Sequence, residues 1–259
     1  MLCLCDIMVL TEVKKLNTRQ EDIINLLEIH GEVSIRELAE KMNVSEMTIH
    51  RDLDYLEEMK YLYKKRGAAV YVNKPDRDKS TFYSDEKTRI GKKVTEFVKP
   101  GQSVIFDNST TSFEAAKFLR DMSDMTFYTT NTEITQVLSG GRSIVYCSGG
   151  YYFPETGGFV GEKAEEFVDG ITADICVIGA SGISLEKGIT NPYPMHTRLQ
   201  KKIMNSAKYK ILVADHSKFD KVAVENCGYL EDIDLIITDS GISEDVLERY
   251  KEKVKIEVV

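Results

Sequence analysis

The sequence predicts a two-part protein, in which a small helical unit precedes a larger α/β domain with a mostly parallel sheet. Two observations predict this fold. Up to about residue 72 the apolar residues recur at helical spacing, and after residue 100 short strand-like apolar runs alternate with helical stretches. The length of 259 residues also suits two domains, at roughly 150 residues per domain.

The predicted boundaries follow from changes in composition along the chain. A polar stretch with little periodicity separates the two parts and is typical of a linker. The predicted division is an N-terminal extension at 1–15, a first domain at 16–72, a linker at 73–85 and a second domain at 86–259.

The first domain reads as three short helices followed by a hairpin. Gly31 is placed to end the first helix, as glycine often does after a last helical turn. Ser34 and Glu37 have the spacing of a capping box and predict the start of the second helix. Ser45 can cap a third helix whose inner face carries Ile49, Leu53 and Leu56. Together with a basic hairpin at 61–72, this order describes a winged helix-turn-helix.

In that arrangement the outer side of the third helix enters the major groove of DNA, and the hairpin brings cations to the phosphate backbone. The loss of one phosphate contact lowers the salt slope of binding by about 0.9. The residues predicted to contact DNA are Ser45, Thr48, His50, Arg51, Lys64, Lys65 and Arg66.

Two other interpretations of this domain stay open. A lone Lys/Arg run is usually just a solvated face of a helical bundle, although the complete order of elements favours DNA binding. The winged unit could also dock a protein. Loss of duplex binding in an Arg51→Ala variant that still folds would count against that.

Composition limits the class of protein. The net charge of −8 comes from 34 Lys and Arg against 42 Asp and Glu, and residues 1–75 are slightly acidic as well. Any affinity for DNA must therefore come from a local basic surface. The five cysteines form no C-x-x-C pair, which argues against a disulfide framework and a structural zinc site.

The sequence predicts neither a membrane segment nor a cofactor. No run reaches the roughly 18 apolar residues of a membrane span, and the apolar start lacks the basic region of a signal peptide, so we expect a cytoplasmic protein. Neither a Walker loop nor a G-x-G-x-x-G fingerprint is present, so ATP and NAD are not predicted. His196, His216 and Cys227 could meet at a metal only by accident of folding, and no metal site is predicted.

The second domain places small and polar residues directly after its strand-like runs. In an open parallel sheet, ligands bind beyond the carboxyl ends of the strands, so these residues are expected to meet at one edge. The strand-like runs are 103–107, 126–130, 143–147, 174–179, 210–215, 234–239 and 254–259.

The sharpest of these sites is the run Ser109-Thr110-Thr111, which follows a strand and opens an amphipathic helix. Free N–H groups at a helix start favour an anion, and hydroxyl donors add to that. Helix capping would explain one hydroxyl, but three in a row predict a phosphate site. Lys218 follows another strand and could complete the site, although by itself it would more often be a surface lysine.

Several motifs together make the chain resemble the DeoR family of bacterial transcription regulators over almost its whole length. The segment VSEMTIHRDLDYLE at 44–57 is similar to that family's recognition-helix signature, with His50 where arginine is usual. Arg66-Gly67-Ala68-Ala69 resembles the wing motif, and DNSTT at 107–111 resembles the D-x-G-T-T loop, with Ser109 in place of glycine. Later motifs also match in order: Thr130-Asn131, Gly149-Gly150, Gly179 with Gly182, and Asp215-His216-Ser217-Lys218-Phe219.

The resemblance implies a sensor domain similar to sugar-phosphate isomerases, which binds a phosphorylated sugar without turning it over. We therefore predict a repressor of a sugar-metabolism operon that a sugar phosphate releases, with Asp107 as the acceptor for a sugar hydroxyl. The signal would pass through residues 73–89. Residues expected around the effector are Asp107, Ser109, Thr110, Thr111, Asn131, Gly149, Gly179, Gly182 and Lys218.

The expected partners are a double-stranded operator, the effector, and further copies of the chain in a homodimer or homotetramer, because a single reading helix needs a symmetric partner. The alternative is a sugar-phosphate isomerase with an appended DNA-binding module. That enzyme would need a general base, for which Asp107 and Asp215 are the candidates.

Overall fold

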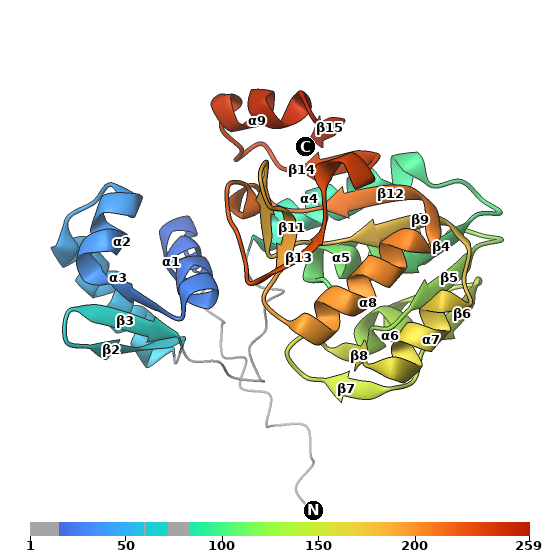
Figure 1. Cartoon of the computed structure of the whole chain (residues 1–259), viewed down its shortest axis with the longest axis horizontal. Helices are drawn as coiled ribbons and strands as arrows, with labels where there is room; N and C mark the ends of the chain where they lie inside the picture. The colour runs from blue at the N-terminus through green and yellow to red at the C-terminus, as the bar shows by residue number, and fades with distance from the viewer. Residues whose placement is uncertain (1–15, 60, 72–82) are drawn as a thin grey trace, which may run out of the picture.

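A computed structural model describes residues 16–59, 61–71 and 83–259 (Figure 1). The predicted N-terminal extension, and residues 73–82 of the predicted linker, lie outside the described residues. The last part of that predicted linker is folded. Tyr83 is buried in the core of the first domain, and a helix begins at the next residue. The second folded unit therefore begins before residue 86, where we placed its boundary.

The first domain has the predicted winged helix-turn-helix order, with one additional short strand. Its three strands form an antiparallel sheet in the order β1-β3-β2. The elements are α1 (Thr18–His30), β1 (Glu32–Ser34), α2 (Ile35–Met42), α3 (Glu46–Glu58), β2 (Leu62–Lys65) and β3 (Ala68–Tyr71).

Local chemistry sets the ends of these helices. Gly31 has φ +75° and its N–H bonds the carbonyl of Leu27, so it ends α1 as predicted. Ser34 caps α2 by accepting the N–H of Glu37 at 3.1 Å. The Glu37 carboxylate pairs instead with Lys41, one turn along the same helix, rather than bonding back to the cap as predicted.

The second domain is built on a seven-stranded parallel sheet in the order β15-β14-β12-β9-β4-β5-β6. All seven predicted strand-like runs are found in it, so the predicted α/β fold class is confirmed. The strands are β4 (Ser103–Phe106), β5 (Thr126–Thr129), β6 (Ile144–Cys147), β9 (Ala173–Ile178), β12 (Ala207–Val213), β14 (Leu235–Thr238) and β15 (Ile256–Val258).

Helices cover both faces of this sheet, and side chains alternate between two cores. On β9, Ile175 and Val177 face one core while Cys176 and Ile178 face the other, as the period-2 geometry of a strand requires. The first of these cores packs against α4 (Ser84–Val94), α5 (Thr110–Leu119) and α6 (Thr132–Ser139). The opposite core packs against α7 (Glu162–Asp169), α8 (Pro194–Asn205) and α9 (Glu244–Lys251).

Two small sheets, which the sequence did not predict, lie beside the main one. The first has the order β10-β11-β13 and the second pairs β7 with β8. Their strands are β7 (Tyr151–Phe153), β8 (Gly158–Val160), β10 (Gly182–Ser184), β11 (Gly188–Asn191) and β13 (Glu225–Gly228). The described residues also include the 3-10 turns η2 (Thr95–Phe97), η3 (His216–Lys218) and η4 (Leu230–Asp232).

The two domains are in contact. Helix α1 lies on the side of the first domain that faces the sheet domain (Figure 1), and hydrogen bonds cross from α1 to Tyr83, Ser217 and Lys218. Among the described residues, no helix combines the length and apolar character that a membrane crossing requires.

Candidate effector cavity and DNA-binding surface

Helix α3 has a capped start, a buried inner face and an exposed outer face, the features predicted for the recognition helix. Ser45 caps it by accepting the N–H of Thr48, and the two hydroxyls share a hydrogen bond of 2.9 Å. Its inner face is fully buried in the core of the domain, through Ile49, Leu53 and Leu56. His50 and Arg51 are exposed on its outer side, as a base- or phosphate-contacting surface requires.

The three basic side chains of the wing differ in whether they form ion pairs with carboxylates of the same domain. Lys64 pairs with Asp54 and Glu57 of α3. Lys65 pairs with Glu32 of β1 at 3.0 Å. Arg66 is exposed at the tip of the hairpin, next to Gly67 with φ +76°. Two of the three predicted wing contacts therefore already have carboxylate partners within the domain.

A cavity of about 380 Å³ opens at the carboxyl edge of the parallel sheet. Its walls come from the ends of β4, β9 and β12, from the start of α5, and from the loop between β7 and β8. Six of the predicted effector residues line it: Asp107, Ser109, Thr110, Thr111, Gly179 and Lys218.

The start of α5 is presented to this cavity by a local network. Ser109 caps the helix by accepting the N–H of Ser112 at 3.1 Å, which leaves Thr110 and Thr111 at the first helical positions. Gly179 packs so closely on this loop that an added Cβ would lie 2.4 Å from the Cβ of Ser109. The chain thus brings the start of a helix, where backbone N–H groups lack intrahelical acceptors, and two threonine hydroxyls to the cavity lining.

Asp107, the predicted acceptor for a sugar hydroxyl, accepts four hydrogen bonds from within the chain. One carboxylate oxygen accepts the N–H of Ser109 at 3.0 Å and the hydroxyl of Ser112 at 2.7 Å. The other accepts the N–H of Gly179 at 2.9 Å and the amide of Gln200 at 3.1 Å. A carboxylate has about four acceptor sites, so this chain already fills them. Asp107 joins the ends of β4 and β9 to α5 and α8.

Three lysines line the cavity, of which the sequence singled out only one. Lys87 of α4 is buried, while Lys218 and Lys221 are partly exposed. Burial, reinforced by the charge of Lys218, lowers the pKa of Lys221 from its ordinary value. The cavity lining therefore contains three lysine side chains from two different parts of the sensor domain.

Asp215 balances part of this charge. It is fully buried, and one of its oxygens accepts the N–H of Ser217 at 3.0 Å together with the Ser217 hydroxyl. Burial acts to raise the pKa of Asp215, but the charges of Lys218 and Lys87 outweigh it, so that pKa lies below its ordinary value. Asp215 is thus an ionised carboxylate in the cavity wall.

Some buried polar atoms of cavity residues have no hydrogen-bond partner among the described residues. Nδ2 of Asn108, Oδ2 of Asp215 and Oε2 of Glu155 are among them. A buried polar atom left unpaired costs about 1–3 kcal/mol, so a bound polar molecule would relieve that cost. One donor and two acceptors suit a polyhydroxylated ligand.

Three predicted effector residues do not line the cavity. Asn131 is buried, caps α6 through the N–H groups of Glu133 and Ile134, and donates to the carbonyl of Thr156 in the cavity loop. Gly149 is exposed outside the lining. Gly182 begins β10, where an added Cβ would lie 2.5 Å from the carbonyl of Lys221. Asn131 and Gly182 are structural positions in this fold.

Sequence reasoning missed other lining residues for identifiable reasons. Asn108 lies inside the quoted loop and could have been included for its donor group. Lys87 and Asn25 lie on helices, where only burial marks them, and burial of a polar residue cannot be seen in a helical pattern. His216, which the sequence offered as a possible metal ligand, pairs with Asp239 at 2.8 Å. The described residues contain no cluster of three or more His, Cys, Asp or Glu side chains suited to a metal.

This combination, a winged helix-turn-helix joined to an α/β domain with a polar cavity, defines a DNA-binding regulator with a sensor domain. Comparison with known families agrees in both parts. The family described as "DeoR-like helix-turn-helix domain" matches residues 19–75, and "DeoR C terminal sensor domain" matches residues 83–240. The chain belongs to the DeoR family of transcription regulators, as its motifs predicted.

Three similar proteins are named as transcriptional repressors, one of them putatively. The transcriptional repressor AccR of Agrobacterium fabrum is 31% identical over 92% of this chain and 94% of its own. A putative aga operon transcriptional repressor of Escherichia coli O157:H7 is 29% identical, over 93% of this chain and 92% of its own. The glycerol-3-phosphate regulon repressor of Escherichia coli K12 is 30% identical, over 87% of this chain and 92% of its own.

Solved structures show a more distant likeness. A ribose 5-phosphate isomerase A from Methanocaldococcus jannaschii has 15% sequence identity and a TM-score of 0.39, covering 53% of this chain and 55% of that one. This chain therefore spans just over half of that enzyme's length.

Proposed function

We propose that this protein represses a sugar-related operon and that a phosphorylated sugar, bound in the cavity of the sensor domain, releases it from DNA. Support comes from its relatives, which include a repressor of a glycerol-3-phosphate regulon and a putative repressor of an aga operon. In this proposal effector and DNA favour different conformations, with a coupling of about 1–3 kcal/mol.

The observation that carries the proposal is that one cavity joins an anion-binding end to hydroxyl-binding groups. The start of α5, with Thr110 and Thr111, faces the same space as Lys218. A phosphate dianion is favoured where a helix start and a cation meet. The unpaired atoms of Asn108 and Asp215 are available for hydroxyls of the attached sugar.

On the DNA side, we assign base and backbone contacts to the outer surface of α3 and to the wing tip. Ser45, Thr48, His50 and Arg51 belong to the α3 surface. Arg66 is the strongest candidate for a phosphate contact from the wing, because Lys64 and Lys65 must first leave their carboxylates. Two copies of the chain would read a symmetric operator, with half-sites about one helical turn apart, in the cytoplasm.

We further propose that the sensor domain binds its ligand without turnover. An isomerase needs a carboxylate base free to take a proton from the sugar. The Asp107 oxygens are occupied by four donors of the chain, and Asp215 is a weak base because neighbouring lysines lower its pKa.

The test is a thermal-shift screen of pentose and hexose phosphates on the full chain, followed by a turnover assay on each hit. We expect at least one phosphosugar to stabilise the protein, its unphosphorylated sugar to have no effect, and no product to form. Product formation would establish the isomerase instead. Equal stabilisation by the unphosphorylated sugar would contradict the anion site.

A further inference from the structure

The cavity is not made by the sensor domain alone. Helix α1 of the DNA-binding domain contributes Asn25, Glu28 and Ile29 to its lining. Asn25 is only 6% exposed, although it is a polar residue on a helix of the smaller domain. A ligand in this cavity would therefore meet the two domains at once.

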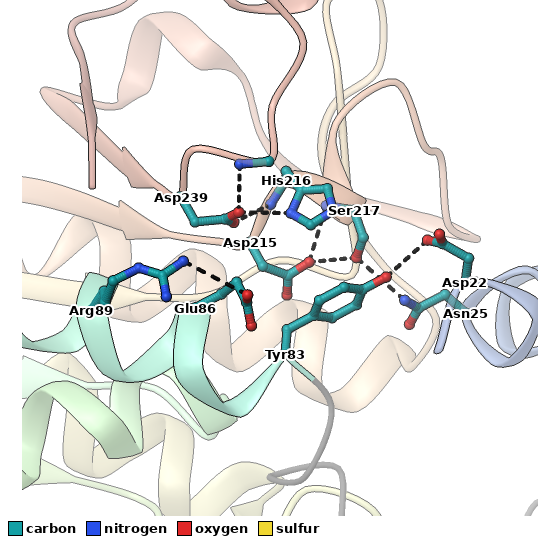
Figure 2. A network of polar contacts seen from close by, with 10 residues as sticks. Asp22, Asn25, Tyr83, Glu86, Arg89, Asp215, His216, Ser217 and Asp239 are labelled. Atoms are coloured by element: carbon teal, nitrogen blue, oxygen red, sulfur yellow. Dashed lines mark hydrogen bonds and ion pairs between the residues drawn. The ribbon is translucent and has the colours of Figure 1, made fainter. Parts of the chain in front are cut away.

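Asn25 hydrogen-bonds Lys218, the lysine that we assign to the proposed phosphate site. Its Oδ1 accepts a hydrogen bond from Nζ of Lys218 at 3.2 Å. Its Nδ2 donates to Oγ of Ser217 at 3.3 Å, as Figure 2 shows. The two polar atoms of this one side chain thus bind consecutive residues of η3, which follows β12 at the edge of the cavity.

Neighbouring contacts fix this junction. The hydroxyl of Tyr83 donates to Asp22 of α1 at 2.8 Å, and the N–H of Tyr83 donates to Glu21 at 3.3 Å. The ring of Tyr83 packs edge-on against His216, with 5.1 Å between centroids (Figure 2). The docked position of α1 is therefore tied to η3 and to the start of α4.

We infer that Asn25 is a positioning residue of the effector site: it holds Lys218 against helix α1 in the empty protein, and a phosphate group in the cavity competes with it for that lysine. A phosphate oxygen is a stronger acceptor for an ammonium group than a neutral amide oxygen, because both partners of the bond are then charged. When Lys218 turns to phosphate, α1 loses one of the two bonds that Asn25 makes to η3.

This inference rests on the proposed function and specifies how the site is regulated. Binding at the cavity and docking of α1 oppose each other, so each must weaken the other by the same factor. The route from effector to recognition helix then runs directly from Lys218 to α1, in addition to the covalent connection at residues 73–89 that we predicted.

The experiment uses the full chain and inorganic phosphate as the probe. Hydrogen–deuterium exchange of residues 18–30 reports whether α1 is docked, and calorimetric titration gives phosphate affinity. Asn25→Ala removes the side-chain amide that competes with phosphate for Lys218. Asn25→Asp replaces that amide with a charged group that holds Lys218 more firmly. Thr18→Ala, at the exposed first residue of α1, is the matched control.

We expect saturating phosphate to raise exchange in α1 of the parent several-fold. Asn25→Ala should show raised exchange without phosphate and bind phosphate about three- to tenfold more tightly, the equivalent of one net hydrogen bond. Asn25→Asp should shift phosphate affinity in the opposite direction, and Thr18→Ala should match the parent. Opposite shifts from the two variants cannot both come from misfolding.

The outcomes separate this inference from the proposed function. If phosphate binds but α1 exchange does not change, the competition is wrong and the anion site stands. If Asn25→Ala binds phosphate more weakly, Asn25 is a direct ligand contact and the competition is also wrong. If the parent binds neither phosphate nor any phosphosugar, both proposals fail.

Discussion

Replacement of Asp107 by alanine would distinguish a carboxylate that holds the sensor domain together from one that recognises the effector. The variant removes the acceptor of four hydrogen bonds in a fully buried place. Two of the four donors keep a second acceptor. The Ser112 hydroxyl lies 3.1 Å from the carbonyl of Val177, and the Gln200 amide lies 2.6 Å from the carbonyl of Gly179.

The N–H groups of Ser109 and Gly179 are then left without their acceptor. At about 1–3 kcal/mol for each unpaired buried donor, the free energy of unfolding should fall by about 4 kcal/mol. For a domain of this size, about 2–4 °C is lost per kcal/mol, so the melting temperature should fall by about 8–16 °C.

Thermal unfolding followed by near-ultraviolet circular dichroism of the tyrosines measures this effect. Glu155→Gln is the matched control, because it changes a cavity carboxylate with an unpaired oxygen, and its melting temperature should stay within about 2 °C of the parent. If Asp107→Ala melts within the same range and instead loses phosphosugar binding, our structural assignment of Asp107 is refuted.

Three further predictions concern the anion site, the wing and pH. Thr110→Val should reduce the thermal shift given by the best phosphosugar while leaving the unliganded melting temperature nearly unchanged; an undiminished shift would place the phosphate elsewhere. Arg66→Ala should lower the salt slope of duplex binding by about 0.9, and Lys64→Ala by less, because Lys64 already pairs with acids; equal slopes would show that the ion pairs open freely. Burial raises the pKa of Glu21 to about 7, and the hydrogen bond that the His216 ring donates to Asp239 raises the pKa of His216 above its ordinary value. Both groups bind protons more tightly when folded, so the stabilisation from each is present at low pH. The part from Glu21 is lost as pH rises through about 7, and the part from His216 as pH rises through its raised pKa. Denaturation curves from pH 5 to 9 should show that loss, reduced in Glu21→Gln, and a pH-independent stability would contradict it.

Most of the fold could be predicted because its signals are local. The caps at Ser45 and Ser109, the glycine after α1 and the alternating strands all leave a pattern in a few neighbouring residues. The small sheets could not be predicted in this way. Strands β7, β8 and β10 are three residues each, and their pairing depends on partners that only the folded chain brings close.

The site was predictable only where its residues directly follow a strand. Asp107 directly follows β4 and Gly179 directly follows β9, and both line the cavity. Asn131 also follows a strand, but its side chain is used to cap α6. Asn25 carries no signal of this kind, because its contacts lie about 190 positions away in the sequence.

The internal ion pairs of the wing have a consequence for how the protein searches a chromosome. Carboxylates of the same domain neutralise two of the three positive charges of the wing, and the whole chain has a net charge of −8. Non-specific binding to DNA of arbitrary sequence should therefore be weak. Few molecules of the regulator would then be bound to non-operator DNA. Occupancy of the operator would then depend on favourable contacts between α3 and the correct base sequence. The free energy of those contacts would offset the cost of opening the ion pairs of the wing.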